Sequence, residues 1–138
     1  MRKIVASFRR LEKEFDAVIV EGAGGILVPL SRRKLLIDVV ESLGLPVVVV
    51  AANKLGAINH TLLTVEALRA RDISVLGIVF NTLDRGEDEA VVRDNPEIVK
   101  VFARVPILGQ LAWSKDAGRL YRCFKPIGEK VLAGLLRT

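Results

Sequence analysis

The 138-residue sequence has almost none of the residues that build disulfide frameworks and metal clusters. Its single cysteine, Cys123, excludes an internal disulfide and a multi-cysteine zinc site, and its single histidine, His60, excludes a polyhistidine metal site. The longest uninterrupted apolar run, Val47 to Ala52, is far shorter than the roughly 20 residues of a membrane-spanning helix. Hydrophobic residues make up 51% of the chain and charged residues 27%, as in soluble globular domains, so a cytoplasmic location is expected.

Aromatic residues are also scarce, at 5% of the chain, and this bears on the meaning of the net charge of +5. Residues 84–97 hold six acids against two arginines, whereas residues 100–138 hold eight basic side chains against two acids. A basic chain can bind nucleic acid, but here no aromatic side chains interleave with the basic ones over any length. Solvated helix faces explain the charge more simply, so we expect neither a nucleic acid nor a membrane as partner.

Strand-like and helix-like segments alternate along the chain, and this order predicts parallel crossovers in one α/β domain over residues 1–138. Four short runs of apolar and β-branched residues predict strands at 16–21, 47–52, 74–81 and 106–110. Four segments with helical spacing predict helices at 2–15, 35–43, 60–71 and 95–104.

Several details of these elements follow from single residues. The run from Val47 to Ala52 is expected to be buried on both faces, because β-branched residues fill it. Gly44 is expected to end one helix, and Asn95 with Pro96 to start another as N-cap and first residue. The C-terminal helical region is expected to be kinked or split at Pro126, and Cys123 within it is interpreted as a buried, inert thiol.

The segment from Val20 to Gly25 places a carboxylate at the end of a predicted strand, with glycines directly after it. Open α/β sheets bind ligands at the carboxyl ends of their strands. The glycines let the backbone approach a ligand closely, and Glu21 could hold a hard cation such as Mg²⁺. A tight turn with a solvated glutamate is the simpler alternative, but three glycines in four positions exceed what a turn needs, so a ligand site is favoured.

The segment from Lys54 to Thr61 again follows a predicted strand and runs into a helix. Unpaired amides at a helix N-terminus, with the helix dipole behind them, attract carboxylates or phosphates. Asn59 could equally be a plain N-cap without a ligand. His60 is more often a structural hydrogen-bonding residue than a catalyst, so no chemical role is assigned to it.

Asn81 and Asp84 follow the third predicted strand, where an amide could read a purine edge, although Asn-Thr-Leu-Asp is also ordinary turn chemistry. No segment matches the Walker A pattern of glycine, four residues, glycine, lysine and serine or threonine. The loop after Glu21 also fails the dinucleotide fingerprint, because Leu27 stands where the third glycine should be.

Three segments together closely resemble dethiobiotin synthetase. They are DAVIVEGAGGILVPL from Asp16 to Leu30, LPVVVVAANKLGAINHTLLT from Leu45 to Thr64, and GIVFNTLD from Gly77 to Asp84. The similarity extends to about Trp113 and fades in the C-terminal helices. The glutamate-glycine motif and the asparagine-histidine helix start are specific when they occur together, whereas either one alone is also similar to cobyrinic and cobyric acid synthases.

The resemblance implies a P-loop NTPase-like parallel sheet with flanking helices, and a ligase reaction of biotin biosynthesis. In that family 7,8-diaminononanoate takes up CO₂ as a carbamate, MgATP phosphorylates the carbamate, and ring closure yields the cyclic urea of dethiobiotin. The resemblance therefore implies ATP as a substrate, Mg²⁺ as a cofactor and a homodimer as the assembly.

The family's site roles can be carried over by position. Glu21 is implied to ligate Mg²⁺, and the residues after it are implied to line the substrate and phosphate site: Gly22, Ala23, Gly24 and Gly25. Asn81 is implied to read adenine beside the loop formed by Leu111, Ala112 and Trp113. The substrate carboxylate is implied to bind to a run of backbone amides, and in the family this contact is made across the dimer interface. The amides belong to Leu55, Gly56, Ala57, Ile58 and Asn59.

One departure from the family concerns its beginning. The family starts with a strand, a phosphate-binding loop with its lysine and threonine, and a lysine that handles the carbamate, whereas here Met1 falls directly before the helix that precedes Glu21. We therefore expect a truncated fold, with the first strand and Walker A loop absent, and we assign no catalytic residue. In the family the absent strand lies between the strands at 16–21 and 47–52. These two strands would pair with each other, or another, P-loop-bearing chain would fill the gap, or the domain would be poorly stable alone.

The sequence thus indicates an incomplete dethiobiotin synthetase-like domain over residues 1–138, whose MgATP-dependent activity is contingent on a P-loop segment encoded elsewhere. The alternative is a non-catalytic truncated relative that dimerises or binds a small carboxylate without hydrolysing ATP. A synthase of the corrinoid amidation group is disfavoured because no glutaminase nucleophile is visible.

Overall fold

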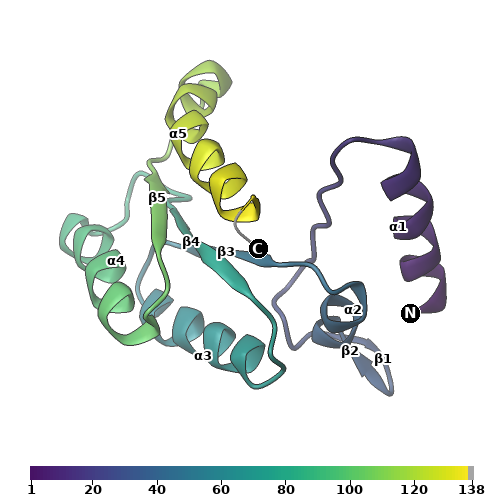
Figure 1. Ribbon diagram of the computed structural model, residues 1–138. Helices are drawn as coiled ribbons and strands as arrows, with labels where there is room; N and C mark the ends of the chain where they lie inside the picture. Colours follow the sequence, from purple (N-terminus) through teal and green to yellow (C-terminus); the bar gives the residue numbers. More distant parts are fainter. Residues whose placement is uncertain (137–138) are drawn as a thin grey trace.

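The computed structural model describes residues 1–136, and Figure 1 shows their arrangement. Five helices and five strands are found within that range. The helices are α1 (Arg2–Glu14), α2 (Leu36–Leu43), α3 (Ala57–Arg69), α4 (Glu89–Ala103) and α5 (Ala117–Leu135). The strands are β1 (Pro29–Ser31), β2 (Lys34–Leu35), β3 (Val47–Ala52), β4 (Val75–Asn81) and β5 (Ile107–Leu111).

The centre of the fold is a three-stranded parallel sheet in the order β3-β4-β5. Its crossover helices α3 and α4 lie on one face and α5 lies on the other (Figure 1). Phe80 and Ile78 of β4 are fully buried against Val65 and Val99 on the first face, while Val79 packs on the α5 side. The predicted α/β layering with a parallel sheet is therefore confirmed.

The edge of the sheet at β3 is open among the described residues, because β3 pairs only with β4. Val50 in the middle of β3 is 66% exposed, although its neighbours Val49 and Ala51 are buried under α3. The prediction that this strand is buried on both faces is therefore wrong at Val50. The physical reason is that α5 packs on β4 and β5 and leaves this part of β3 uncovered.

The predicted strand at residues 16–21 does not form. The segment is extended but unpaired, and Figure 1 shows it running beside α1, apart from the sheet. Only Val18 is partly buried, in a small cluster with Phe8 of α1 and Val39 of α2, whereas Ile19 is 94% exposed. A strand needs a neighbour to bond its backbone, and neither β3 nor any other described segment supplies one. The two apolar segments thus do not pair with each other.

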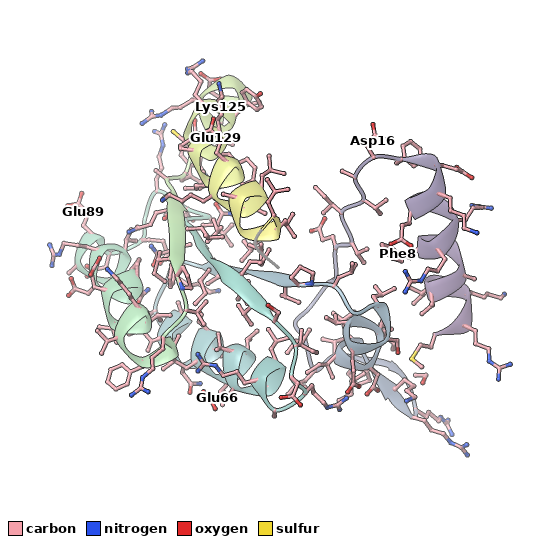
Figure 2. The ribbon with its side chains drawn as sticks, in the orientation of Figure 1. Phe8, Asp16, Glu66, Glu89, Lys125 and Glu129 are labelled. Carbon is pink, nitrogen blue, oxygen red and sulfur yellow. The ribbon has the colours of Figure 1, made fainter. Side chains whose placement is uncertain are left out.

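Residues 22–35 join this segment to α2. They contain the short antiparallel hairpin of β1 and β2. α2 ends as predicted, since Gly44 adopts the left-handed conformation at φ 66° and its amide bonds back to Val40 and Glu41. Phe8 points from α1 toward α2 (Figure 2), so α1 and α2 pack as a pair beside the hairpin.

Two helix starts differ from the predictions. α3 begins at Ala57, three residues before the expected His60, with Gly56 as N-cap. α4 begins at Glu89, where the Asp88 carboxylate caps it, and Pro96 lies inside this helix instead of at its first position. The expected N-cap role of Asn95 is therefore wrong.

The C-terminal helix also differs, because α5 continues through Pro126 without a break. Its later half packs on β5 through the buried Ile127, and Lys130 Nζ donates to the Leu108 carbonyl at 2.8 Å. Its first half extends past the end of β5 (Figure 1). Cys123 is exposed, so the prediction of a buried thiol is wrong. No helix within residues 1–136 is long and apolar enough to cross a bilayer.

Candidate functional site

The carboxyl ends of the three parallel strands meet at one edge of the molecule. Ala52 of β3 is in register with Asn81 of β4, and Asn81 with Leu111 of β5. The chain after each strand is bonded to its neighbour: Asn53 N donates to the Asn81 carbonyl at 2.8 Å, and Thr82 N donates to the Leu111 carbonyl at 2.9 Å. The structure therefore brings together the segments predicted to bind the substrate carboxylate and adenine.

The loop before α3 presents backbone donors at this edge. Gly56 adopts φ 86°, a conformation that side chains rarely allow, and the Ala57 amide donates to the Lys54 carbonyl at 3.1 Å. Within residues 1–136, no hydrogen bond engages the neighbouring amides, which belong to Leu55, Gly56, Ile58 and Asn59. Free N–H groups at the positive end of a helix dipole suit a carboxylate or phosphate.

Asn59 and His60 lie in the first turn of α3, and both are exposed. Because Gly56 is the N-cap, the alternative interpretation of Asn59 as a plain N-cap is wrong. The His60 ring faces a shallow groove of about 200 Å³ between α3 and β3, which Lys54, Thr61 and Thr64 also line. Among the described residues, His60 belongs to no group of three or more histidine, cysteine, aspartate or glutamate side chains that could hold a metal ion.

A buried network of side-chain amides lies beneath this loop, and the sequence analysis missed it. Asn95 of α4 donates through Nδ2 to Asn53 Oδ1 at 2.9 Å and to the Lys54 carbonyl at 3.0 Å. Asn53 in turn donates through Nδ2 to the Val92 carbonyl at 2.9 Å and to Gln110 Oε1 at 3.5 Å. The position of Asn53 directly after an apolar strand could have indicated a polar side chain at the sheet edge. Its hydrogen-bond partners could not be predicted, because they come from distant segments.

The loops after β4 and β5 form the other part of this edge. Asn81 is half-buried, and so is Trp113, two residues after β5. The guanidinium of Arg85 stacks over the Trp113 ring at 4.3 Å from its centroid. The Asp84 carboxylate accepts from the Gly86 amide at 3.1 Å, so it closes the turn that carries Arg85. The sequence analysis did not assign a role to Arg85 either.

Glu21 and the glycines after it lie apart from this edge. Glu21 is exposed and borders an apolar groove of about 420 Å³ between α1 and residues 18–21. Gly24 and Gly25 adopt φ of 83° and 109°, so this loop has the conformation that glycines permit. Figure 2 shows Asp16 pointing outward from the start of this segment, well away from the carboxyl end of the sheet. The structure thus unites two of the three predicted clusters and separates the third.

A carboxylate such as Glu21 is the type of ligand that Mg²⁺ takes, but it supplies one ligand only. Among residues 1–136, no group of three or more histidine, cysteine, aspartate or glutamate side chains could hold a metal ion. A Mg²⁺ ion bound at Glu21 would therefore need its remaining ligands from phosphate oxygens, water or further protein groups.

Comparison with known proteins identifies a family and several relatives of this chain. The family described as "AAA domain" matches residues 1–119. The chain belongs to this AAA-domain family. It is 43% identical over 132 residues to the ATP-dependent dethiobiotin synthetase of Anaeromyxobacter dehalogenans strain 2CP-1, and 37% identical over 126 residues to that of Thermodesulfovibrio yellowstonii. The resemblance to dethiobiotin synthetase is therefore confirmed.

The extent of these matches differs between this AAA-domain chain and its relatives. The matches cover 95% and 86% of this chain but only 59% and 52% of the two relatives. A third relative, the biotin biosynthesis bifunctional protein BioCD of Bordetella avium, is 46% identical over 94 residues, which is 68% of this chain and 19% of that protein. The chain thus spans about three fifths or less of the curated relatives that it matches.

Proposed function

We propose that this chain carries the substrate-binding and adenine-binding parts of a dethiobiotin synthetase, which converts 7,8-diaminononanoate, CO₂ and MgATP to dethiobiotin in biotin biosynthesis. The observation that carries the proposal is the single sheet edge that holds both the free amides around Gly56 and the Asn81–Trp113 region. Hydrogen bonds from Asn53 N to the Asn81 carbonyl and from Thr82 N to the Leu111 carbonyl join the ends of the three strands there. The relatives named as ATP-dependent dethiobiotin synthetases support it.

In this proposal the substrate carboxylate docks on the unpaired amides of the loop before α3. The amides of Leu55, Gly56, Ile58 and Asn59 offer N–H groups without reorganisation, and the α3 dipole adds favourable charge. The Lys54 ammonium nearby adds a positive charge on the same groove. With its carboxylate held here, the diamine would extend across the proposed dimer interface toward the phosphate donor.

The adenine is proposed to lie between Asn81 and the loop of Leu111, Ala112 and Trp113. The Asn81 amide has both a donor and an acceptor, which suits the edge of adenine, and no side-chain bond occupies it in the described structure. The Trp113 indole offers an aromatic wall beside it. We infer that binding of the base occurs next to Arg85.

The chemistry itself involves three bond changes. One substrate amine attacks CO₂ to give a carbamate, a carbamate oxygen takes the γ-phosphoryl group of ATP, and the second amine displaces phosphate as it closes the urea ring.

Glu21 is proposed to hold Mg²⁺, which neutralises phosphate charge when bound, and Gly22 to Gly25 are proposed to line the phosphate site. No segment of the 138-residue sequence matches the Walker A pattern, so we propose that a further P-loop segment binds the triphosphate.

The open edge of β3 is the proposed place for that segment. Val50 is 66% exposed there, and Ile19 of the unpaired segment is 94% exposed, so both could be covered by an added strand. A strand inserted between β3 and residues 16–21 would satisfy both open edges and bring Glu21 toward the carboxyl edge of the sheet. We further propose that the complete enzyme is a homodimer and acts in the cytoplasm, where ATP is available.

Isothermal titration of the chain with 7,8-diaminononanoate, with and without MgATP, tests the binding part. We expect the diamine to bind, and Gly56→Val, which forces a β-branched residue into φ 86°, to weaken binding. Gly86→Val is the matched control, because Gly86 lies in an exposed turn without positive φ. Absence of diamine binding by the wild-type chain would contradict the proposal.

The catalytic part is tested by adding the remaining portion of the Anaeromyxobacter relative as a separate polypeptide and assaying dethiobiotin formation. We expect turnover from the mixture, and we expect Glu21→Gln to weaken its binding of Mg²⁺-nucleotide without changing the fold. Glu14→Gln is the control, because Glu14 is an exposed carboxylate at the end of α1. Diamine binding with neither turnover nor a nucleotide response would favour the non-catalytic alternative.

A further inference from the structure

The starting observation is a proline inside a helix. Pro96 has no N–H, so the carbonyl of Val92, four residues earlier in α4, lacks the donor that a regular α-helix would supply from position 96. The structure gives this carbonyl a donor from elsewhere: Asn53 Nδ2 lies 2.9 Å from it. A tertiary hydrogen bond therefore replaces the helical one that Pro96 removes.

Asn53 is consequently fixed from several sides. It is 1% exposed, its backbone amide donates to the Asn81 carbonyl at the end of β4, and its Oδ1 accepts from Asn95. Asn95 is 4% exposed and uses the same Nδ2 to donate to the Lys54 carbonyl at 3.0 Å. Every buried side-chain polar atom in the described structure has a partner, so this network is complete.

The Lys54 carbonyl is the link to the loop before α3. It accepts from Asn95 and also from the Ala57 amide, which closes the turn that opens α3. This turn sets the direction of the free amides around Gly56. The Asn95 side chain thus joins this turn to the Asn53 side chain, and the Asn53 backbone amide joins it to the end of β4 at Asn81.

We propose that Asn53 and Asn95 are positioning residues, which hold the amide cluster before α3 in the geometry that captures the substrate carboxylate. This inference rests on the proposed function for the identity of the ligand, whereas the placement of the amides by Asn53 and Asn95 does not depend on it. Neither residue touches the ligand, because both are buried beneath the loop. A network of this kind is costly to leave half-satisfied, since a buried donor or acceptor without a partner loses its hydration.

The test compares Asn95→Leu with Val99→Ala. The leucine removes both hydrogen bonds of Asn95, while Val99 is equally buried one turn further along α4 and makes no hydrogen bond to the loop. Amide hydrogen exchange, corrected for global stability, should rise on the order of tenfold at Ala57 and His60 in Asn95→Leu but not in Val99→Ala. Equal exchange in the two variants would overturn the positioning role.

The dissociation constant for 7,8-diaminononanoate provides the second measurement. It should rise on the order of tenfold in Asn95→Leu and stay near the wild-type value in Val99→Ala. If both variants bind like the wild type, the inference is wrong even though the proposed function stands. If the wild type binds no diamine, the proposed function is wrong, and the exchange experiment alone decides the positioning role.

Pro96→Ala provides a milder variant in case Asn95→Leu does not fold. The alanine restores an N–H that can donate to the Val92 carbonyl, so Asn53 Nδ2 would have to share this acceptor. We expect the NMR signals of the Asn53 side-chain amide to shift and the exchange at Ala57 to increase. Unchanged signals and unchanged exchange would equally overturn the proposal.

Discussion

Arg71 Nη1 lies 3.0 Å from Asp38 Oδ1, so the guanidinium that follows α3 is paired with the first turn of α2. The same nitrogen lies 2.9 Å from Glu41 Oε2, one turn later in α2. Asp38 also accepts from the Leu35 amide at 2.8 Å, just before α2 begins. One carboxylate thus closes the start of α2 and joins it to the end of α3.

This arrangement predicts how the protein responds to acid. The Leu35 N–H and then the Arg71 guanidinium hold the pKa of Asp38 below its ordinary value. A lowered pKa in the folded state means that the stabilisation is complete above the unfolded pKa, about 4, and is lost as the pH falls through the folded value. Asp38→Asn should therefore lower Tm at pH 7, and its difference from the wild type should shrink below about pH 4.

Thermal unfolding followed by circular dichroism measures the Tm of both proteins. The range from about pH 2 to about pH 7 spans the pKa of a free carboxyl, about 4. Asp16→Asn is the control, because Asp16 is exposed and has no ion pair in the described part of the chain. A Tm difference for Asp38→Asn that stays constant down to the acid limit would contradict the assignment.

Gly24 predicts a second measurable effect. Its φ is 83°, and a Cβ added there would lie 3.0 Å from Val28 Cγ2. Gly24→Ala should lower the free energy of unfolding by about 1 kcal/mol, because an L side chain is strained in the left-handed region. Urea unfolding measures the loss, and Gly86→Ala serves as control, since its Cβ would meet only Asp84 Oδ1 at 3.8 Å. Equal losses in both variants would argue against the strain.

The sheet could be predicted from the sequence because its strands carry their own signals. Val47 to Ala52 and Ser74 to Asn81 are runs of apolar and β-branched residues that end at polar ones, and β3 and β4 form there. Since parallel strands end at a common edge, the meeting of the loop before α3 with Asn81 and the Trp113 loop also followed.

The failures have a common cause, which is that distant partners decided the outcome. Residues 16–21 have the composition of a strand, but strand formation depends on a pairing neighbour, and none lies beside them in the described structure. Asn95 and Pro96 resemble a helix start, yet α4 runs through them, and Asn53 supplies to the Val92 carbonyl the donor that Pro96 lacks. No local pattern in α4 contains that information.

Cys123 offers a third prediction, on the accessibility of α5. The thiol is exposed on the part of the helix that extends beyond β5, so it should react with Ellman's reagent at nearly the rate of a free thiol in the native protein. The reference is the same protein in denaturant, and the comparison is the ratio of the two rates. A native rate that is a hundredth of the denatured rate or less, on the order of 3 kcal/mol of protection, would show that the first half of α5 is covered.

Arg85 and Trp113 give the last prediction. Trp113 is the single tryptophan of the chain, so its fluorescence reports this one contact. Arg85→Ala should shift the emission to longer wavelength, because water replaces the guanidinium over the indole face, at a cost in stability of about 0.5–1 kcal/mol. Arg85→Lys should give a smaller shift, since a lysine keeps the charge but loses the planar stack.

The matched control for Arg85 is Arg93→Ala, which removes an exposed arginine that pairs only with its neighbour Asp94. Its emission spectrum should equal that of the wild type. Addition of MgATP to the complemented enzyme should then change the emission of the wild type, because the base is proposed to bind beside Trp113. Identical spectra for Arg85→Ala and Arg93→Ala would show that the guanidinium does not lie on the indole in solution.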